Sequence, residues 1–165
     1  MNRVRRTARR RLFAATALAA CSLPLTTGCT EAARCGPPAL DEVSQMDLYG
    51  TYAGPHGSRL TLTNTGGTTV TFTARDWPAG NGAGILAEGA PSFDGTGTWS
   101  VVSAPGEPGR VRLSFENRET GRPGPPLQQL EVGKGEGDAP PMLFARLGDP
   151  DVCRVYELER ERGGG

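Results

Sequence analysis

The most regular pattern in this chain is an alternation of apolar and polar residues. Leucines alternate with polar residues over 59–63, and Val70 and Phe72 alternate with threonines over 68–73. A period of two places successive side chains on opposite faces of a β-strand. Residues 64–67, Asn-Thr-Gly-Gly, lie between the two stretches and are typical of a tight turn. The pattern therefore predicts a β-hairpin.

Further short stretches of the same kind are separated by clusters of Gly and Pro. They cover residues 48–53, 97–103, 110–116, 127–132, 142–145 and 153–159. No window after residue 45 has an apolar stripe of period 3.6 long enough for a helix, although residues 40–46 have room for one or two turns. The chain is thus predicted to be all-β, with about eight short strands joined in sequence. Such an order is typical of a single antiparallel up-and-down β-barrel or of a two-sheet sandwich.

The same alternation predicts which side chains face the interior. In each strand the apolar residues fall on one face, while Arg110, Arg112, Ser114 and Glu116 fall on the opposite, water-facing side. The predicted core consists of Leu60, Leu62, Val70, Phe72, Trp99, Val101, Val111, Leu113, Phe115, Leu130, Val132, Tyr156 and Leu158.

The first 28 residues have the charge and hydrophobicity of a signal peptide. Six arginines and no acidic residue precede or border the apolar run 12–20, which is shorter than the roughly 20 apolar residues of a membrane span. The stretch from Arg9 to Phe13 also fits a twin-arginine export signal, so this route and the general secretory route both stay open. We expect residues 1–28 to target the chain for export and then to be removed.

Two cysteines compete as the lipidated residue. Leu25 to Cys29 resembles the bacterial lipobox, and Leu18 to Cys21 is a rival closer to the usual pattern. Cleavage before Cys21 would leave an odd thiol in an exported chain, whereas cleavage before Cys29 leaves one pair, Cys35 and Cys153. We therefore predict lipidation of Cys29 and a disulfide between Cys35 and Cys153. A plain secretory signal with unmodified Cys29 is the remaining alternative.

These features predict the domain organisation and the cellular location of the mature chain. Residues 29–43 form a lipidated N-terminus and tether, and residues 44–162 form the barrel-like domain. Because the leader holds six arginines and no acidic residue, its removal changes the formal net charge from 0 to −6. An acidic domain argues against nucleic acid as a partner. We expect a monomer held by its lipid anchor on the outer face of the cell membrane.

Two short motifs carry a resemblance to known proteins. Leu48 to Tyr52 and Gly95 to Trp99 resemble the Gly-x-aromatic strand openings of lipocalin-like bacterial domains. The whole layout, from the lipobox to Leu147-Gly148-Asp149-Pro150-Asp151 and a closing strand, is similar to small uncharacterised lipoproteins of high-GC Gram-positive bacteria. The resemblance implies a lipocalin-like β-domain and a location at the membrane, and it implies no particular activity.

The search for reaction chemistry gives no catalytic residue, no metal site and no cofactor. His56, the sole histidine, lies in a Pro-His-Gly-Ser stretch that is typical of an exposed turn. Asp149 and Asp151 are close enough in sequence to share a Ca²⁺ ion, but such an ion takes six to eight oxygen ligands. An Asp-capped turn is the preferred interpretation. No serine lies in a nucleophile elbow, and no glycine-rich stretch has a phosphate-loop order.

One connection is long for a β-protein and carries apolar residues. It runs from Pro78 to Ser92 and holds Ile85 and Leu86 among glycines, shortly after Trp77. We predict that Trp77, Ile85 and Leu86 flank a binding surface, with Trp77 as the fixed anchor of the loop. The alternative is an insertion whose Ile85 and Leu86 pack onto the barrel.

The sequence-based expectation for function is a non-enzymatic binding module of the cell envelope. Its ligand would be a small apolar molecule or an envelope component. The alternative is an interaction or inhibitor protein that docks on an envelope enzyme through its loops. A hollow barrel would favour the first function, and a filled core with an exposed apolar rim would favour the second.

Overall fold

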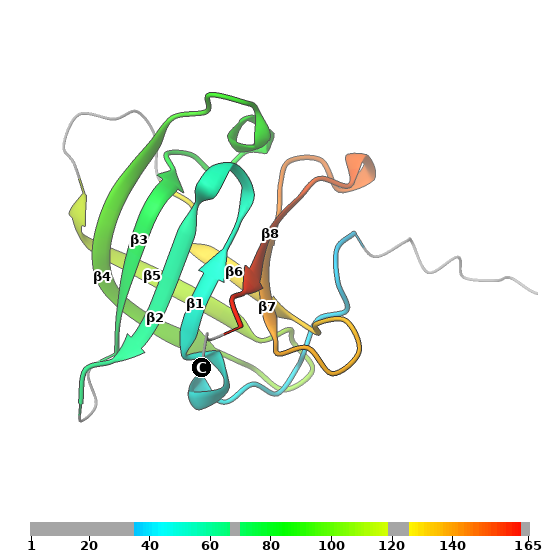
Figure 1. The fold of residues 1–165 in the computed structure, drawn as a ribbon. Coiled ribbons are helices and arrows are strands. Elements are labelled where there is room, and N and C mark those ends of the chain that lie inside the picture. The colour runs from blue at the N-terminus through cyan, green and yellow to red at the C-terminus, as the bar shows by residue number, and fades with distance from the viewer. Residues whose placement is uncertain (1–34, 67–69, 119–125, 163–165) are drawn as a thin grey trace, which may run out of the picture. The chain divides into compact units, whose positions relative to one another are not determined.

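The computed structural model describes residues 35–66, 70–118 and 126–162 (Figure 1). Its eight strands form one closed antiparallel barrel in the order β1 to β8, and β8 pairs back onto β1. This confirms the predicted up-and-down barrel of lipocalin-like type and rules out the two-sheet sandwich. The strands are β1 (Gly50–Ala53), β2 (Arg59–Asn64), β3 (Val70–Pro78), β4 (Ser92–Val102), β5 (Arg110–Arg118), β6 (Gln129–Gly133), β7 (Met142–Arg146) and β8 (Val155–Arg160).

The helical segments are single 3-10 turns that connect or close the barrel. They are η1 (Gln45–Leu48), η2 (Pro55–Gly57), η3 (Ala83–Leu86) and η4 (Pro150–Val152). Within the described residues there is no α-helix, as the alternation of the sequence predicts. No helix in this part of the chain is long and apolar enough to cross a membrane.

The barrel interior is filled by the side chains that the period of two places inward. Tyr52, Phe72, Trp77 and Tyr156 are among the largest fully buried side chains, and the predicted leucines of β2, β5, β6 and β8 are at most 1% exposed. Val70, Val101 and Phe115 are half-buried and pack against this cluster. Burying this apolar surface is the main favourable term for folding.

Strands β3 and β4 are longer than the alternation predicts. The register between them shifts between Ala74 and Trp77, where Asp76 adopts a left-handed conformation with φ of 46°. This β-bulge lets β3 continue to Pro78, and β4 begins at Ser92 instead of Gly97. The connection between the two strands is therefore 79–91, within the predicted loop.

The up-and-down order gathers the connections at two opposite ends of the barrel. One end, here called the loop end, carries the β1–β2, β3–β4 and β7–β8 connections, with η2, η3 and η4 (Figure 1). The other end, here called the far end, carries η1 and the β4–β5 and β6–β7 connections.

The segment from Cys35 to Val43, which is the described part of the predicted tether 29–43, packs along the barrel, and residues 29–34 lie outside the described residues. The Arg146 guanidinium donates to the Cys35 carbonyl at 2.8 Å, and the Leu40 amide donates to the Val132 carbonyl at 2.9 Å. Leu40 and Val43 also pack against the core. These contacts could not be predicted from the sequence, because most of the hydrogen bonds join backbone groups and Leu40 and Val43 follow no regular apolar pattern.

The predicted disulfide is confirmed by geometry. The Cys35 and Cys153 sulfur atoms are 2.08 Å apart, and the two residues are separated by 118 positions in the sequence. Cys153 follows η4 in the β7–β8 connection, so the bond fastens the start of the described chain to the loop end. Cys21 and Cys29 lie outside the described residues.

Candidate functional site

A small cup at the loop end is the candidate functional site. Its volume is about 210 Å³, and it opens between η2 and the β3–β4 connection. The cup combines prolines and other apolar groups with a few polar side chains, which is the usual composition of a binding site. It is lined by Pro55, His56, Asp76, Pro78, Ile85, Gly89, Ala90, Pro91, Ser92 and Tyr156.

The β1–β2 turn forms one wall of the cup. His56 has a left-handed backbone, with φ of 57°, and the turn is closed by a 2.8 Å hydrogen bond from the Gly54 amide to the Ser58 carbonyl. Gly54 is required here, since a Cβ atom would meet Ser58 Oγ at 2.6 Å and Leu158 Cδ2 at 2.8 Å. The turn thus projects His56 over the cup.

The β3–β4 connection forms the opposite wall. The Ala79 amide donates to the Pro91 carbonyl at 2.8 Å and closes the base of the loop. Ile85 is 7% exposed and packs into the core, and Leu86 is half-buried. His56 Nε2 donates to the Leu86 carbonyl at 3.1 Å, so the imidazole bridges the two walls.

Backbone strain is concentrated at the cup. His56 and Asp76 are two of three residues other than glycine with positive φ in the described chain, and both line the cup. The strained conformation of Asp76 is supported by its amide, which donates to Asp94 Oδ1 at 3.0 Å. Such residues persist where the surrounding structure holds them, and they cluster at functional sites.

A buried hydroxyl pair supports the floor of the cup. Tyr156 OH donates to Ser58 Oγ at 2.5 Å, and both residues are at most 2% exposed. Burial raises the pKa of Tyr156, and the Ser58 hydrogen bond opposes that effect. The phenol therefore stays neutral near pH 7 and acts as a fixed donor within the fold.

Of the three residues predicted to flank a binding surface, two are buried in this structure. Trp77 is fully buried, its Nε1 donates to the Leu127 carbonyl at 3.0 Å, and its ring stands edge-on to Tyr156. Ile85 lines the cup and is 7% exposed. The apolar residues of the loop thus pack onto the barrel, which was the alternative interpretation. His56 and Asp76 were missed as cup residues.

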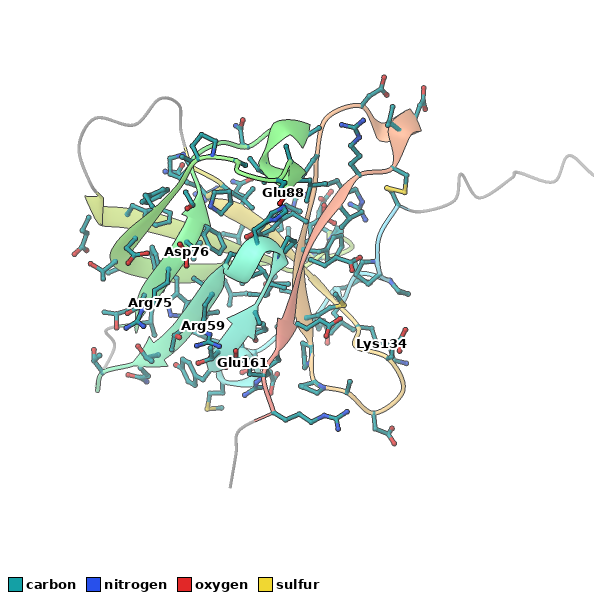
Figure 2. The ribbon with its side chains drawn as sticks, turned by 45° about the horizontal axis from the view of Figure 1, so that its top comes forward. Arg59, Arg75, Asp76, Glu88, Lys134 and Glu161 are labelled. Carbon is teal, nitrogen blue, oxygen red and sulfur yellow. A yellow bond between two sulfur atoms is a disulfide. The ribbon has the colours of Figure 1, made fainter. Side chains whose placement is uncertain are left out.

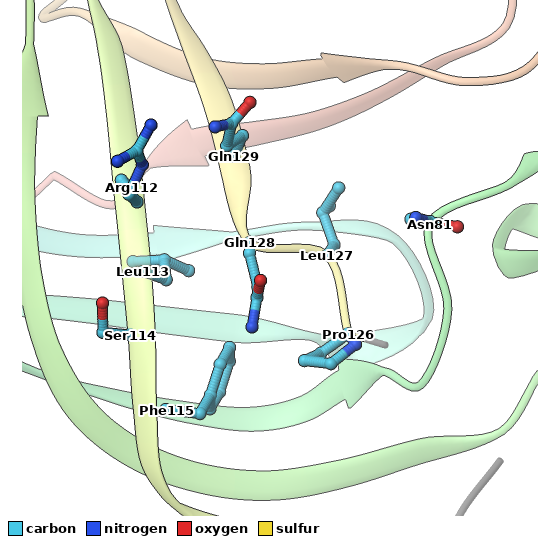
Figure 3. Close-up of a pocket in the computed structure, with 9 residues that line it drawn as sticks. All are labelled: Asn81, Arg112, Leu113, Ser114, Phe115, Pro126, Leu127, Gln128 and Gln129. Carbon is cyan, nitrogen blue, oxygen red and sulfur yellow. The ribbon is translucent and has the colours of Figure 1, made fainter. Parts of the chain in front are cut away.

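A second opening lies in the barrel wall beside β5. The β5–β6 pairing covers only Arg110–Arg112, and the Leu113 amide then donates to the Gln128 carbonyl. Beyond this point the strands diverge, leaving a groove of about 510 Å³ that Figure 3 shows. Its lining is Asn81, Arg112, Leu113, Ser114, Phe115, Pro126, Leu127, Gln128 and Gln129.

The polar groups of the cup suit hydrogen bonding more than proton transfer. His56 Nε2 holds the loop carbonyl, and the Ser58 hydroxyl is held by Tyr156. Among the described residues, no cluster of three or more His, Cys, Asp or Glu side chains is arranged to hold a metal ion. The arrangement offers the Asp76 carboxylate and a proline-lined cavity to an incoming group.

Comparisons with known proteins identify no relative of this chain. No protein-family model, no curated protein sequence and no solved structure matches it. The class of protein is therefore defined by the fold alone, as a small eight-stranded up-and-down β-barrel with a Cys35–Cys153 disulfide.

Proposed function

We propose that this protein is a lipid-anchored, non-enzymatic binding module on the outer face of the cell membrane, which recognises an envelope component at the cup. The observation that carries the proposal is the combination of a filled barrel and a strained cup at the loop end. With large aromatic side chains filling the interior, recognition falls to the connections at one end.

The size of the cup decides what kind of group it accepts. A volume of about 210 Å³ lies below the roughly 300–1,000 Å³ typical of sites that enclose a whole drug-sized ligand. The cup therefore suits one protruding group of a larger partner, such as a side chain on a protein loop. Asp76 at the cup favours a partner group that donates hydrogen bonds or carries positive charge.

Site-specific crosslinking in the native bacterium tests this proposal. A photo-crosslinking amino acid replaces Ser92 at the cup, and in a parallel strain it replaces Lys134 at the far end. We expect a discrete adduct from the first position, and its loss when Ala90→Trp fills the cup. Ala104→Trp, on the exposed β4–β5 turn, is the matched control and should leave the adduct unchanged.

The anchor is tested by fractionation. Cys29→Ser should release the protein from the membrane or leave it unprocessed, because two or more acyl chains are needed for stable anchoring. A Cys29→Ser protein that still fractionates as a lipidated membrane protein would point to Cys21.

In the crosslinking experiment, adducts of equal yield from Ser92 and Lys134 would count against the cup as the recognition site.

The wall groove supports a second candidate function, the binding of a small apolar ligand. Leu113, Phe115 and Leu127 supply apolar surface in a cavity large enough for such a molecule. A solvatochromic fatty-acid probe should gain fluorescence with the wild-type protein and lose that gain with Ser114→Trp. An unchanged signal in the variant would exclude the groove as the binding site.

A further inference from the structure

The disulfide makes the chain enter the barrel at the loop end. Cys35 is bonded to Cys153 in the β7–β8 connection, and its carbonyl accepts from Arg146 at the end of β7. The chain then crosses to the far end, where the Lys134 amide donates to the Pro38 carbonyl at 2.8 Å. Cys35, the first described residue, is thus held at the loop end of the barrel.

The spacing of the cysteines limits how far this end can stand from an anchor. Cys29 precedes Cys35 by six residues, and six residues span at most about 20 Å when fully extended. A free tether reaching to Ser44 would be 15 residues long, with a reach of about 50 Å, and would start from the far end. With the disulfide, the loop end is therefore the end held closest to the anchor. Without it, the closest end would be the far end.

We propose that the loop end of the barrel faces the membrane, so that the cup receives a group from a protein embedded in that membrane. The proposal rests on the proposed lipidation of Cys29. It deepens the proposed function, because it selects a membrane protein from among all envelope components. The far end then points away from the membrane.

The charge of the loop end argues for a protein partner over the lipid surface itself. Among the described residues, Asp76, Glu88, Asp149 and Asp151 are exposed at this end, against the positive charges of Arg75 and Arg154. Figure 2 shows Glu88 and Asp76 on separate elements of this region. Anionic headgroups repel such a surface, whereas a basic side chain on an outward-facing protein loop is attracted to it.

The single lysine of the chain makes the orientation measurable. Lys134 lies in the β6–β7 connection at the far end, and Glu88 lies in the β3–β4 connection at the loop end (Figure 2). An amine-reactive fluorophore on the mature lipoprotein labels Lys134. In the double variant with Glu88→Lys and Lys134→Arg, the same fluorophore labels the loop end. Lys134→Arg alone reports any labelling of the N-terminus.

The labelled proteins are added to phosphatidylcholine vesicles that carry a quencher on the lipid headgroup. We expect the greater loss of fluorescence from the label at position 88, because a short tether holds that end near the surface. A flexible Gly/Ser insert of about 20 residues after Ala33 adds a root-mean-square length of about 25 Å and should remove the difference.

Each outcome decides one part of the inference. Equal quenching at the two positions, or greater quenching at position 134, overturns the orientation while leaving the lipid anchor in place. Protein that stays unbound to the vesicles overturns the anchor, and the proposed function with it. Binding of the unlipidated Cys29→Ser protein to phosphatidylglycerol vesicles would show that the loop end recognises lipid, and would overturn the protein partner.

Discussion

The hydroxyl of Tyr156 donates a 2.5 Å hydrogen bond to Oγ of Ser58, joining the start of β8 to the turn after β1. The bond is buried, and Tyr156 lines the cup, so the hydrogen bond ties the floor of the candidate site to one of its walls. Because neither group has access to water, the pair couples the shape of the cup to the stability of the barrel.

Ser58→Ala should lower the free energy of unfolding by about 1–3 kcal/mol, because it leaves the Tyr156 hydroxyl buried without its acceptor. It should also raise the pKa of Tyr156 further, since the lost hydrogen bond opposes the effect of burial. Urea unfolding and ultraviolet titration of the tyrosines measure the two effects. Ser100→Ala, on the exposed face of β4, is the matched control and should change stability by less than about 0.5 kcal/mol.

Tyr52 predicts how the barrel responds to alkali. Burial raises its pKa from 10.0 to about 12, with a smaller opposing effect from Arg160. The unfolded chain therefore loses this proton at lower pH than the folded chain. The associated stability is complete below about pH 10 and is lost as the pH rises to about 12, by roughly 2–3 kcal/mol.

Urea unfolding at pH 8, 10 and 11 measures this alkaline loss. Tyr52→Phe cannot ionise, so its stability should fall less between pH 10 and 11 than that of the wild type. The variant also loses the 3.0 Å hydrogen bond from Tyr52 to the Leu48 carbonyl, which lowers its stability relative to the wild type by about 1 kcal/mol below pH 10. Parallel pH profiles for the two proteins would show that Tyr52 is not the responsible group.

The contact between His56 and Leu86 predicts how the cup is held in shape. His56→Ala removes the donor to the Leu86 carbonyl and so disconnects the β3–β4 connection from the β1–β2 turn. We expect faster hydrogen exchange at the amides of Ile85 and Ala87, with little change at those of β2. His56→Gln keeps a donor at a similar reach and should restore part of the protection. If His56→Ala leaves these amides unchanged, the loop is held by Ile85 packing alone.

The barrel could be predicted from the sequence because its strands bury one face. The alternation of leucines and threonines in β2 determines both the strand and its inward side, and Leu60 and Leu62 are accordingly buried. The extension of β3 through Asp76 could not be predicted, because a β-bulge interrupts the alternation where the strand continues.

The cup was harder to predict because it is made by residues from separate connections. His56, Asp76 and Tyr156 are far apart in the sequence, and none has a motif that marks a site. The up-and-down order itself was the available signal, since it places the β1–β2 and β3–β4 connections at the same end of the barrel. Combining that order with the position of His56 would have brought the turn next to the predicted loop.

The Cys35–Cys153 disulfide should carry a large share of the stability. It closes a loop of more than 100 residues, for which the chain-entropy estimate is about 4–5 kcal/mol, an upper figure because residual structure in the unfolded chain reduces it. Domains of this size are stable by only about 5–15 kcal/mol in total. Reduction should therefore lower the melting temperature by many degrees. The double variant Cys35→Ser with Cys153→Ser should melt like the reduced protein and show no further response to reductant. A melting temperature that is the same with and without reductant would contradict this prediction. It would mean that backbone hydrogen bonds and packing hold the segment from Cys35 to Val43 on the barrel without the disulfide.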